Sequence, residues 1–282
     1  MSVSAEDFVA LARSSPWLWT TLRFTMHQRD RRWPDDPVRG RLRRPDQLRV
    51  EGLNGELRQI VHETQSRAAL LTAEANPDFE PAVLADPAVG LPGAPRHQPA
   101  QRRADGLATA RAHQGRTDYD APMYRNYFWV AIFDPIELAD GLDWDTEATL
   151  PGTEIEAVRE VFHEARPAWE ATLRPTGAYE PRCGCCSMLR SRAVDQAEWG
   201  DGYPHVLLEQ YPTAYQVRLD RETGVCVYTE ALGGDTAGAG HSLSIEAVDE
   251  PMSDELFVDQ RPKRDQPGRR RFRWSAYPGK SS

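Results

Sequence analysis

The chain has very little lysine, which occurs only at Lys263 and Lys280. Arginine provides the other 32 of the 34 basic residues, a bias typical of a high-GC coding sequence and therefore expected of an actinobacterial protein. Without a lysine in the body of the chain, Schiff-base and phosphate-loop chemistry lack the residue on which they depend. The sequence therefore excludes pyridoxal-phosphate enzymes, ordinary P-loop NTPases and protein kinases.

Long apolar runs are also lacking. No stretch of about 18 apolar residues occurs, so we expect no membrane-spanning helix. The N-terminus has no basic start followed by an apolar run, so we expect no signal peptide. These features predict a cytoplasmic protein, and cytoplasmic thiols stay reduced.

Charge is unevenly distributed along the chain. The whole chain carries −9, and residues 258–282 carry +6, so the remaining residues carry −15. An acidic body does not favour nucleic-acid binding. We expect the basic tail at 258–282 to be disordered. The 40% of hydrophobic residues is enough for a sizeable core, and we predict a single domain over residues 1–257.

Alternation of apolar and polar residues predicts most of the secondary structure. Hairpin turns are indicated at Asn54-Gly55 and between Asp220 and Gly224. A short helix should begin after Ser4, which can cap it. The segments with strand alternation are 17–28, 38–44, 166–175 and 241–250. Because no strand–helix–strand rhythm occurs, we predict an α+β fold with one mainly antiparallel sheet and few helices.

Three further segments complete the prediction. Residues 72–122 are rich in Pro, Ala and Gly and indicate a long insertion outside the core. The aromatic run from Tyr124 to Phe133 predicts a buried strand. Residues 152–165 fit either a helix or a strand, and the sequence leaves that choice open.

Two stretches resemble the lipoprotein-localisation-factor-like superfamily of carriers and regulators. The first is "WPDDPVRGRLRRPDQLRVE", and the second is "YQVRLDRETGVCVYTE" followed by "LSIEAVDEPMSDELF". Together they cover about a quarter of the chain. The resemblance implies a curved half-barrel sheet, a concave apolar face covered by helices, and an acyl chain or a partner segment as ligand.

Three of the four cysteines lie in "RCGCCS", at Cys183, Cys185 and Cys186. Thiolates are zinc ligands, and a structural site needs about four of them. Cys226 is the first candidate for the fourth ligand, followed by His163, His205 and His241. The alternatives are small residues packing a turn, a redox dithiol or vicinal disulfide at Cys185–Cys186, and a nucleophilic cysteine. We expect the cluster to stabilise its loop, with or without zinc.

Other residues have two interpretations each. Trp17, Trp19, Trp129 and Trp169 pack a core or line a ligand groove. The row Arg39, Arg41 and Arg43 forms a solvated strand face or contacts an anionic head group. The acids at positions 134, 137 and 140 are expected in a solvated turn rather than in acid–base catalysis.

We therefore predict a non-enzymatic binding protein. Its ligand would be an apolar small molecule, an acyl chain or a protein segment on the concave side of the sheet, contacted by Trp17, Trp19, Arg41, Trp129 and Trp169. The alternative is a biosynthetic enzyme that uses the same cavity, with a metal at the cysteine cluster.

Overall fold

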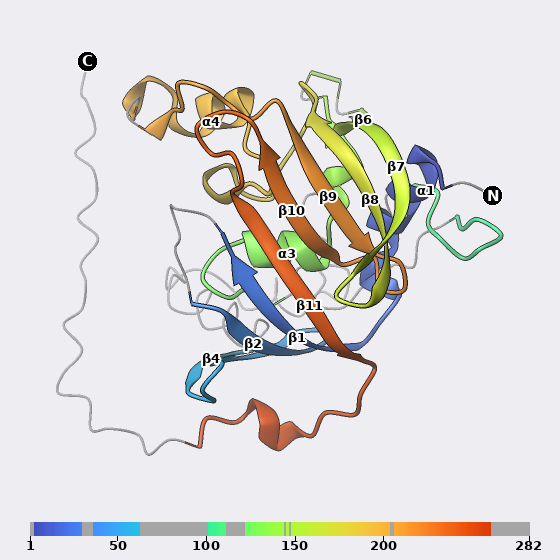
Figure 1. Ribbon diagram of the computed structural model, residues 1–282, viewed down its shortest axis with the longest axis vertical. Helices are drawn as coiled ribbons and strands as arrows, with labels where there is room; N and C mark the ends of the chain where they lie inside the picture. Colours follow the sequence, from blue (N-terminus) through green and yellow to red (C-terminus); the bar gives the residue numbers. More distant parts are fainter. Residues whose placement is uncertain are drawn as a thin grey trace, which may run out of the picture.

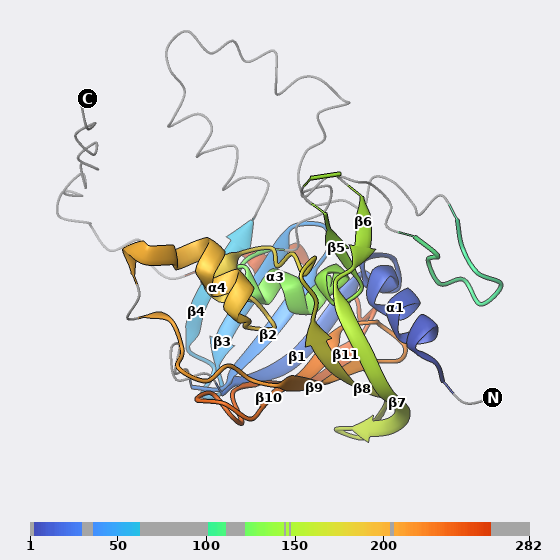
Figure 2. The same ribbon diagram turned by 90° about the horizontal axis from the view of Figure 1, so that it is seen from above.

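A curved antiparallel sheet forms the centre of the molecule. The computed structural model describes residues 3–29, 36–62, 101–110, 122–143, 145–146, 148–203 and 206–260. Nine strands follow one another in the order β4-β3-β2-β1-β11-β10-β9-β8-β7. The sheet does not close, and it wraps around helix α3 (Phe128–Phe133), as Figures 1 and 2 show. The predicted fold class is confirmed.

The strands of this sheet are β1 (Thr21–Gln28), β2 (Val38–Arg43), β3 (Gln47–Gly52), β4 (Leu57–His62), β7 (Thr153–His163), β8 (Arg166–Pro175), β9 (Ala214–Asp220), β10 (Cys226–Leu232) and β11 (Gly240–Val248). A separate pair joins β5 (Asp140–Leu142) and β6 (Thr149–Pro151). Within the described ranges the helices are α1 (Ala5–Ser14), α3 and α4 (Arg192–Trp199), with short 3-10 turns η1 (Ser15–Trp17), η3 (Ile136–Leu138), η4 (Gly184–Cys186), η5 (Gly200–Gly202) and η7 (Asp254–Phe257).

The first predicted strand starts later than expected. Pro16 lies in η1, and β1 begins only at Thr21. From there the alternation holds, with Leu22 and Phe24 fully buried. A strand over residues 17–28 would place Trp19 on the face opposite Leu22 and Phe24, but Trp19 is 3% exposed and packs in the core. It does so because the chain before Thr21 turns instead of extending.

The aromatic run at 124–133 is not a strand. Residues 128–133 form α3, and all six side chains are buried. A helix that is apolar on every side has no period that distinguishes it from a buried strand. The surrounding structure decides between helix and strand for this segment, because the curved sheet supplies apolar contacts around it.

One glycine on β2 makes room for the contact between sheet and helix. Phe24 lies opposite Gly40 in the register of β1 and β2, and a Cβ at Gly40 would lie 2.2 Å from the Phe24 ring. The ring of Phe24 then meets Trp129 at 6.1 Å and Phe133 at 5.1 Å between centroids. We infer that this glycine is needed for α3 to pack inside the sheet.

The open choice at 152–165 resolves to the edge strand β7. A bulge interrupts its pairing with β8 between Glu156 and Arg159, and Ala157 has a φ of 53°. Ile155 and Val158 are three residues apart, yet both pack against the core. The bulge therefore explains why this strand shows a spacing that resembles a helix.

Part of the predicted insertion is described, at residues 101–110. It packs on α1, where Ala108 is fully buried and its N–H donates to Ser14 Oγ at 2.8 Å. Arg103 forms an ion pair with Asp7, the residue that completes the cap at Ser4. This piece is therefore part of the packed structure. The remainder of the insertion and the tail beyond Gln260 lie outside the described residues.

Candidate metal site at the cysteine cluster

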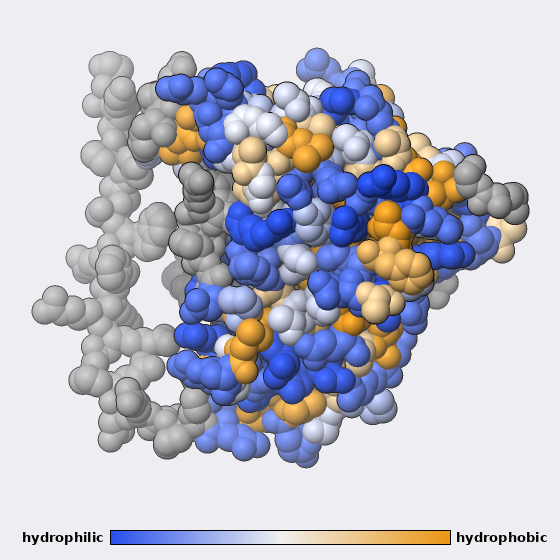
Figure 3. Space-filling view, in the orientation of Figure 1, coloured by the Kyte–Doolittle hydropathy of each residue, from blue (hydrophilic) through white to orange (hydrophobic). Residues whose placement is uncertain are grey.

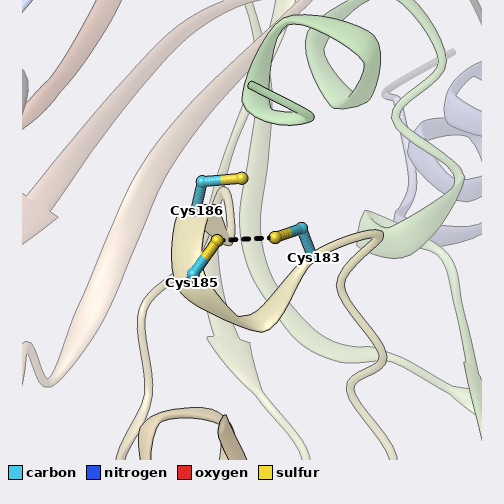
Figure 4. A group of neighbouring side chains, drawn as sticks. All are labelled: Cys183, Cys185 and Cys186. Atoms are coloured by element: carbon cyan, nitrogen blue, oxygen red, sulfur yellow. Dashed lines mark hydrogen bonds between the residues drawn. The ribbon is translucent and has the colours of Figure 1, made fainter. Parts of the chain in front are cut away.

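The three clustered cysteines lie on the loop that joins β8 to α4. The sulfurs of Cys183, Cys185 and Cys186 are all within 4.8 Å of one another. Figure 4 shows Cys183 and Cys185 facing each other, with Sγ atoms 2.8 Å apart. Cys186 is buried, and the other two are half-buried. The loop therefore presents three soft ligands at one point, partly open to solvent.

A buried carboxylate fixes both ends of this loop. Glu137 in η3 is 2% exposed, and it accepts hydrogen bonds from the Tyr179 hydroxyl at 2.5 Å and from the N–H of Arg182 at 3.1 Å. The N–H of Met188 donates to the same carboxylate at 3.3 Å, and the N–H of Leu189 donates to Tyr179 Oη at 3.1 Å. The cluster is thus held between two anchored points.

Burial and hydrogen bonding act in opposite directions on Glu137. Burial raises the pKa of its carboxyl group above the ordinary value, and the hydrogen bonds from Tyr179, Arg182 and Met188 offset only part of that rise. Burial, followed by the nearby charge of Glu137, raises the pKa of Tyr179 well above its ordinary value. The tyrosine therefore stays protonated and donates, which suits a structural role.

The acidic turn around Glu137 is not solvated. Asp134 is 5% exposed and forms an ion pair with Arg182, and Asp140 is 2% exposed and forms an ion pair with Arg13. The expectation of a solvated turn is wrong because each carboxyl group has a partner from a distant segment. The three acids therefore hold α1, the acidic turn and the cysteine loop together.

Two thiols of the metal-free cluster, Cys185 and Cys186, have raised pKa values. Burial raises the pKa of Cys185 to about 11, and the neighbouring Cys183 and the charge of Glu198 add to that rise. Burial also raises the pKa of Cys186 strongly. At neutral pH Cys185 and Cys186 are mainly protonated, so neither is favoured as a catalytic nucleophile. A metal ion would have to displace the protons on binding.

The spacing of the sulfurs fits a metal ion. Tetrahedral zinc with bonds of about 2.3 Å places neighbouring sulfurs roughly 3.8 Å apart. All three sulfurs are within 4.8 Å, so the cluster needs only small movements, the largest being a separation of Cys183 and Cys185 by about 1 Å. Thiolates are the ligands that zinc and monovalent copper prefer.

Cys226 is not part of this group. It is fully buried on β10, where its thiol donates to the Tyr228 carbonyl at 3.6 Å. Two of the three candidate histidines are engaged elsewhere: His163 Nε2 lies 3.1 Å from the Leu243 carbonyl oxygen, and His241 Nε2 lies 2.7 Å from that of Cys226. His205 lies outside the described residues. The structure thus brings together three of the four predicted thiol ligands.

Glu198 is a neighbour of the cluster that sequence reasoning missed. A Cβ at Gly184 would lie 2.5 Å from Glu198 Oε2 and 2.9 Å from Glu198 Cβ. The last turn of α4 therefore packs directly on the middle residue of the Cys-Gly-Cys segment. The only sequence signal was the position of Glu198, 12 residues after Cys186, at the end of a short helix.

Three of the five residues predicted to contact a ligand pack in or against the core, and Arg41 lies apart from them. Trp19 and Trp129 are each 3% exposed and belong to the core, and Trp169 is partly buried against the same core. Trp17 is half-buried in η1. Arg41 lies on the opposite face of the sheet, since its neighbours Gly40 and Leu42 on β2 are the inward residues.

Arg41 lines a groove on the outer face of the sheet. The groove has a volume of about 490 Å³ and lies between β2, β3, β4 and the segment after β11. Arg41 and Arg49 both bind Glu51, at 2.6 Å and 2.7 Å. The remaining lining residues are Leu57, Ser253, Glu255, Leu256, Val258 and Gln260. The face of the molecule seen in Figure 3 is mostly hydrophilic, with hydrophobic residues in small separate groups.

Comparisons with known proteins give only a distant likeness. No protein-family model matches the chain, and no curated protein matches it. Among solved structures it is similar to MucB in complex with MucA(peri), with a TM-score of 0.37 and 11% identity over 91% of this chain and 60% of that one. For MucB alone the TM-score is 0.39, with 12% identity over 91% of this chain and 63% of that one.

The chain thus spans about three fifths of the MucB chains that it matches. A likeness at these TM-scores carries no argument about function. None of the described helices is long and apolar enough to cross a membrane.

Proposed function

We propose that this protein is a non-enzymatic binding protein whose cysteine cluster binds a thiophilic metal ion, with zinc as the first choice. The observation that supports the proposal is the convergence of three sulfurs within 4.8 Å of one another. They lie on a loop whose two ends are bonded to the buried Glu137. Such anchoring lowers the entropy that metal binding would otherwise cost.

Zinc suits this ligand set better than a redox-active metal ion does. Zinc takes three or four thiolate ligands without a preference imposed by d-electrons. Three protein ligands leave one position for water or for a group that moves in, such as the nearby Glu198 carboxylate. A bound metal would then connect the β8–α4 loop to its own neighbours and stabilise it. The alternative of a metalloenzyme would use the same open position.

The concave face of the sheet is less suited to an apolar or acyl ligand than the resemblance implied. Helix α3 already fills it with six buried side chains. Exposing five of them, all except Ala131, would cost on the order of 10 kcal/mol at about 1.5–3 kcal/mol per large apolar side chain. A small apolar molecule would have to offset that cost to enter.

A direct metal measurement tests the proposal. Protein purified under reducing conditions should carry zinc in stoichiometric amount, and cobalt substitution should produce the charge-transfer band of thiolate ligands. The variants Cys183→Ser and Cys186→Ser should each lose metal. Cys226→Ala is the matched control and should retain it, because Cys226 lies outside the group. Reduced wild-type protein without metal affinity would refute the proposal.

The outer groove supports a second candidate, the binding of a partner segment. Its volume of about 490 Å³ lies within the range of about 300–1,000 Å³ that is usual for ligand sites. It also adjoins β4, the last strand on that side of the sheet among the described residues, and extended peptides add to sheet edges. We propose an extended protein segment as its occupant.

A peptide array tests this second candidate. The variants Arg41→Glu and Leu57→Asp, both in the groove, should no longer bind the peptides that the wild-type protein binds. Arg39→Glu is the control, since Arg39 is on the same strand but does not line the groove. Peptide binding that is unchanged in both groove variants would exclude this site.

A further inference from the structure

The two more accessible thiols of the cluster are also its closest pair. Cys183 and Cys185 are half-buried, and their sulfurs are 2.8 Å apart. Cys186 is 5% exposed and belongs to the core cluster. Solvent-borne reagents therefore reach the facing pair before they reach the third thiol.

The distance between the Cys183 and Cys185 sulfurs lies between the distances that two chemical states require. A disulfide requires about 2.05 Å, and two ligands of one zinc ion require roughly 3.8 Å. Both states are within reach of small side-chain movements, because the loop anchors at the N–H groups of Arg182 and Met188 flank the cluster and need not break. The two states exclude each other, since a disulfide sulfur is no longer a thiolate ligand.

Gly184 separates the two cysteines and permits their approach. It packs against Glu198, so the segment between the sulfurs has a fixed position. Cys183 has extended backbone, with φ −149° and ψ 125°, and Gly184 begins the 3-10 turn. This change of direction turns two side chains on nearly adjacent residues toward each other, as Figure 4 shows.

We propose that Cys183 and Cys185 form a reversible disulfide that excludes metal from the cluster, so that the site is controlled by redox state. This inference rests on the proposed metal-binding function. Cys186 stays reduced in the oxidised state. The metal-bound form and the disulfide form are then alternatives of one loop, and zinc protects the pair from oxidation.

The oxidant is a small-molecule disulfide. One of the two cysteines, as thiolate, attacks a sulfur of the oxidant, forming a mixed disulfide and releasing one small thiolate. The other cysteine, as thiolate, then attacks the protein sulfur of that mixed disulfide and releases the second small thiolate. The two protein sulfurs lose two electrons in total, the oxidant becomes two thiols, and the two cysteine protons end on those thiols.

Oxidised glutathione is the probe for the test. Metal-free wild-type protein should lose two of its four free thiols on titration. Alkylation followed by fragmentation of the tryptic peptide 183–190 should place the bond between Cys183 and Cys185, with Cys186 alkylated. Cys186→Ser and Cys226→Ala should still form the bond, and Cys185→Ser should not. Protein loaded with zinc beforehand should keep all four thiols.

The competing outcomes are separable. A bond mapped to Cys185–Cys186, or no bond at all, overturns the inference. So does oxidised protein that takes up zinc as well as reduced protein does. If the proposed metal function fails instead, reduced wild-type protein takes up no zinc. The claim of metal exclusion then falls with it, whichever pair the peptide mapping identifies.

Discussion

The acidic turn from Asp134 to Asp140 and the arginine row of β2 are both clusters of charged residues, yet burial gives them different roles. The carboxyl groups of the turn are 2–5% exposed. In the row, Arg39 is 38% exposed beside Glu246, and Arg43 bonds Asp254, which is 88% exposed. Removing one partner of a buried ion pair costs about 3–5 kcal/mol, whereas an exposed pair contributes about 0–1 kcal/mol.

The acidic turn and the arginine row therefore have different structural roles. The acidic turn organises the cysteine loop from beneath, through the bonds of Glu137 to Tyr179 and to the loop backbone. The arginine row covers the outer face of the sheet and keeps it polar. Variants of the two clusters should therefore differ in both stability and metal binding.

The largest effect is expected for Glu137→Ala. It leaves the Tyr179 hydroxyl and two backbone N–H groups without their buried acceptor, so the free energy of unfolding should fall by about 3–5 kcal/mol. Urea unfolding measures this change. Glu56→Ala is the control, since Glu56 is 61% exposed, and it should change stability by less than about 0.5 kcal/mol. Similar values for both variants would contradict the comparison.

Acid should destabilise the protein through His241, a buried histidine whose ring is neutral in the folded state. Burial lowers the pKa of His241 to about 4, and its ring bonds Thr229 and the Cys226 carbonyl. A lowered folded-state pKa means that this stabilisation is complete above about pH 6.5 and is lost as the pH falls to 4. The loss should amount to about 3 kcal/mol.

Urea unfolding at pH 7 and at pH 4.5 measures this loss. His241→Gln can keep both hydrogen bonds but does not titrate, so the pH dependence of its stability should be shallower than that of the wild type. Equal pH dependence in the two proteins would show that His241 is not responsible.

The cysteine loop should respond to metal more than to mutation alone. Zinc at about 100 times its Kd would stabilise the wild type by about 2.7 kcal/mol. The double variant Cys183→Ser with Cys186→Ser should lose this increment, and its melting temperature in zinc should fall below that of the wild type. Calorimetry with and without a chelator measures the difference. If the double variant melted in zinc at the same temperature as the wild type, the cysteine cluster would have no stabilising role.

The sequence predicted those parts of the fold that local signals determine. The β3–β4 and β9–β10 hairpins were found from period-two alternation and turn residues. Helix α3 was missed because an apolar run has no local period, and only the surrounding sheet decides its form. The form of β7 stayed open because its bulge places Ile155 and Val158, three residues apart, on the same face. That spacing is also typical of a helix.

The candidate site divides in the same way. Three of its thiols lie within four residues, so the sequence identified them together. Their support could not be read from the sequence, because Glu137 is 42 residues from Tyr179, and Asp140 is 127 residues from Arg13. Cys226 was placed in the site by residue type alone, and the sheet holds it elsewhere.

The smallest effect is expected for Arg39→Ala, a variant of the exposed arginine row. Arg39 Nε is 3.6 Å from a Glu246 carboxylate oxygen, and both side chains are partly solvated. Water and salt screen such a pair, so the loss should be about 0–1 kcal/mol and should shrink further as ionic strength rises. Arg13→Ala is the matched buried case, since its partner Asp140 is 2% exposed. It should cost about 3 kcal/mol or more, with little dependence on salt. Urea unfolding of both variants at low and high salt measures this. If Arg39→Ala cost as much as Arg13→Ala, burial would not be what separates the two clusters.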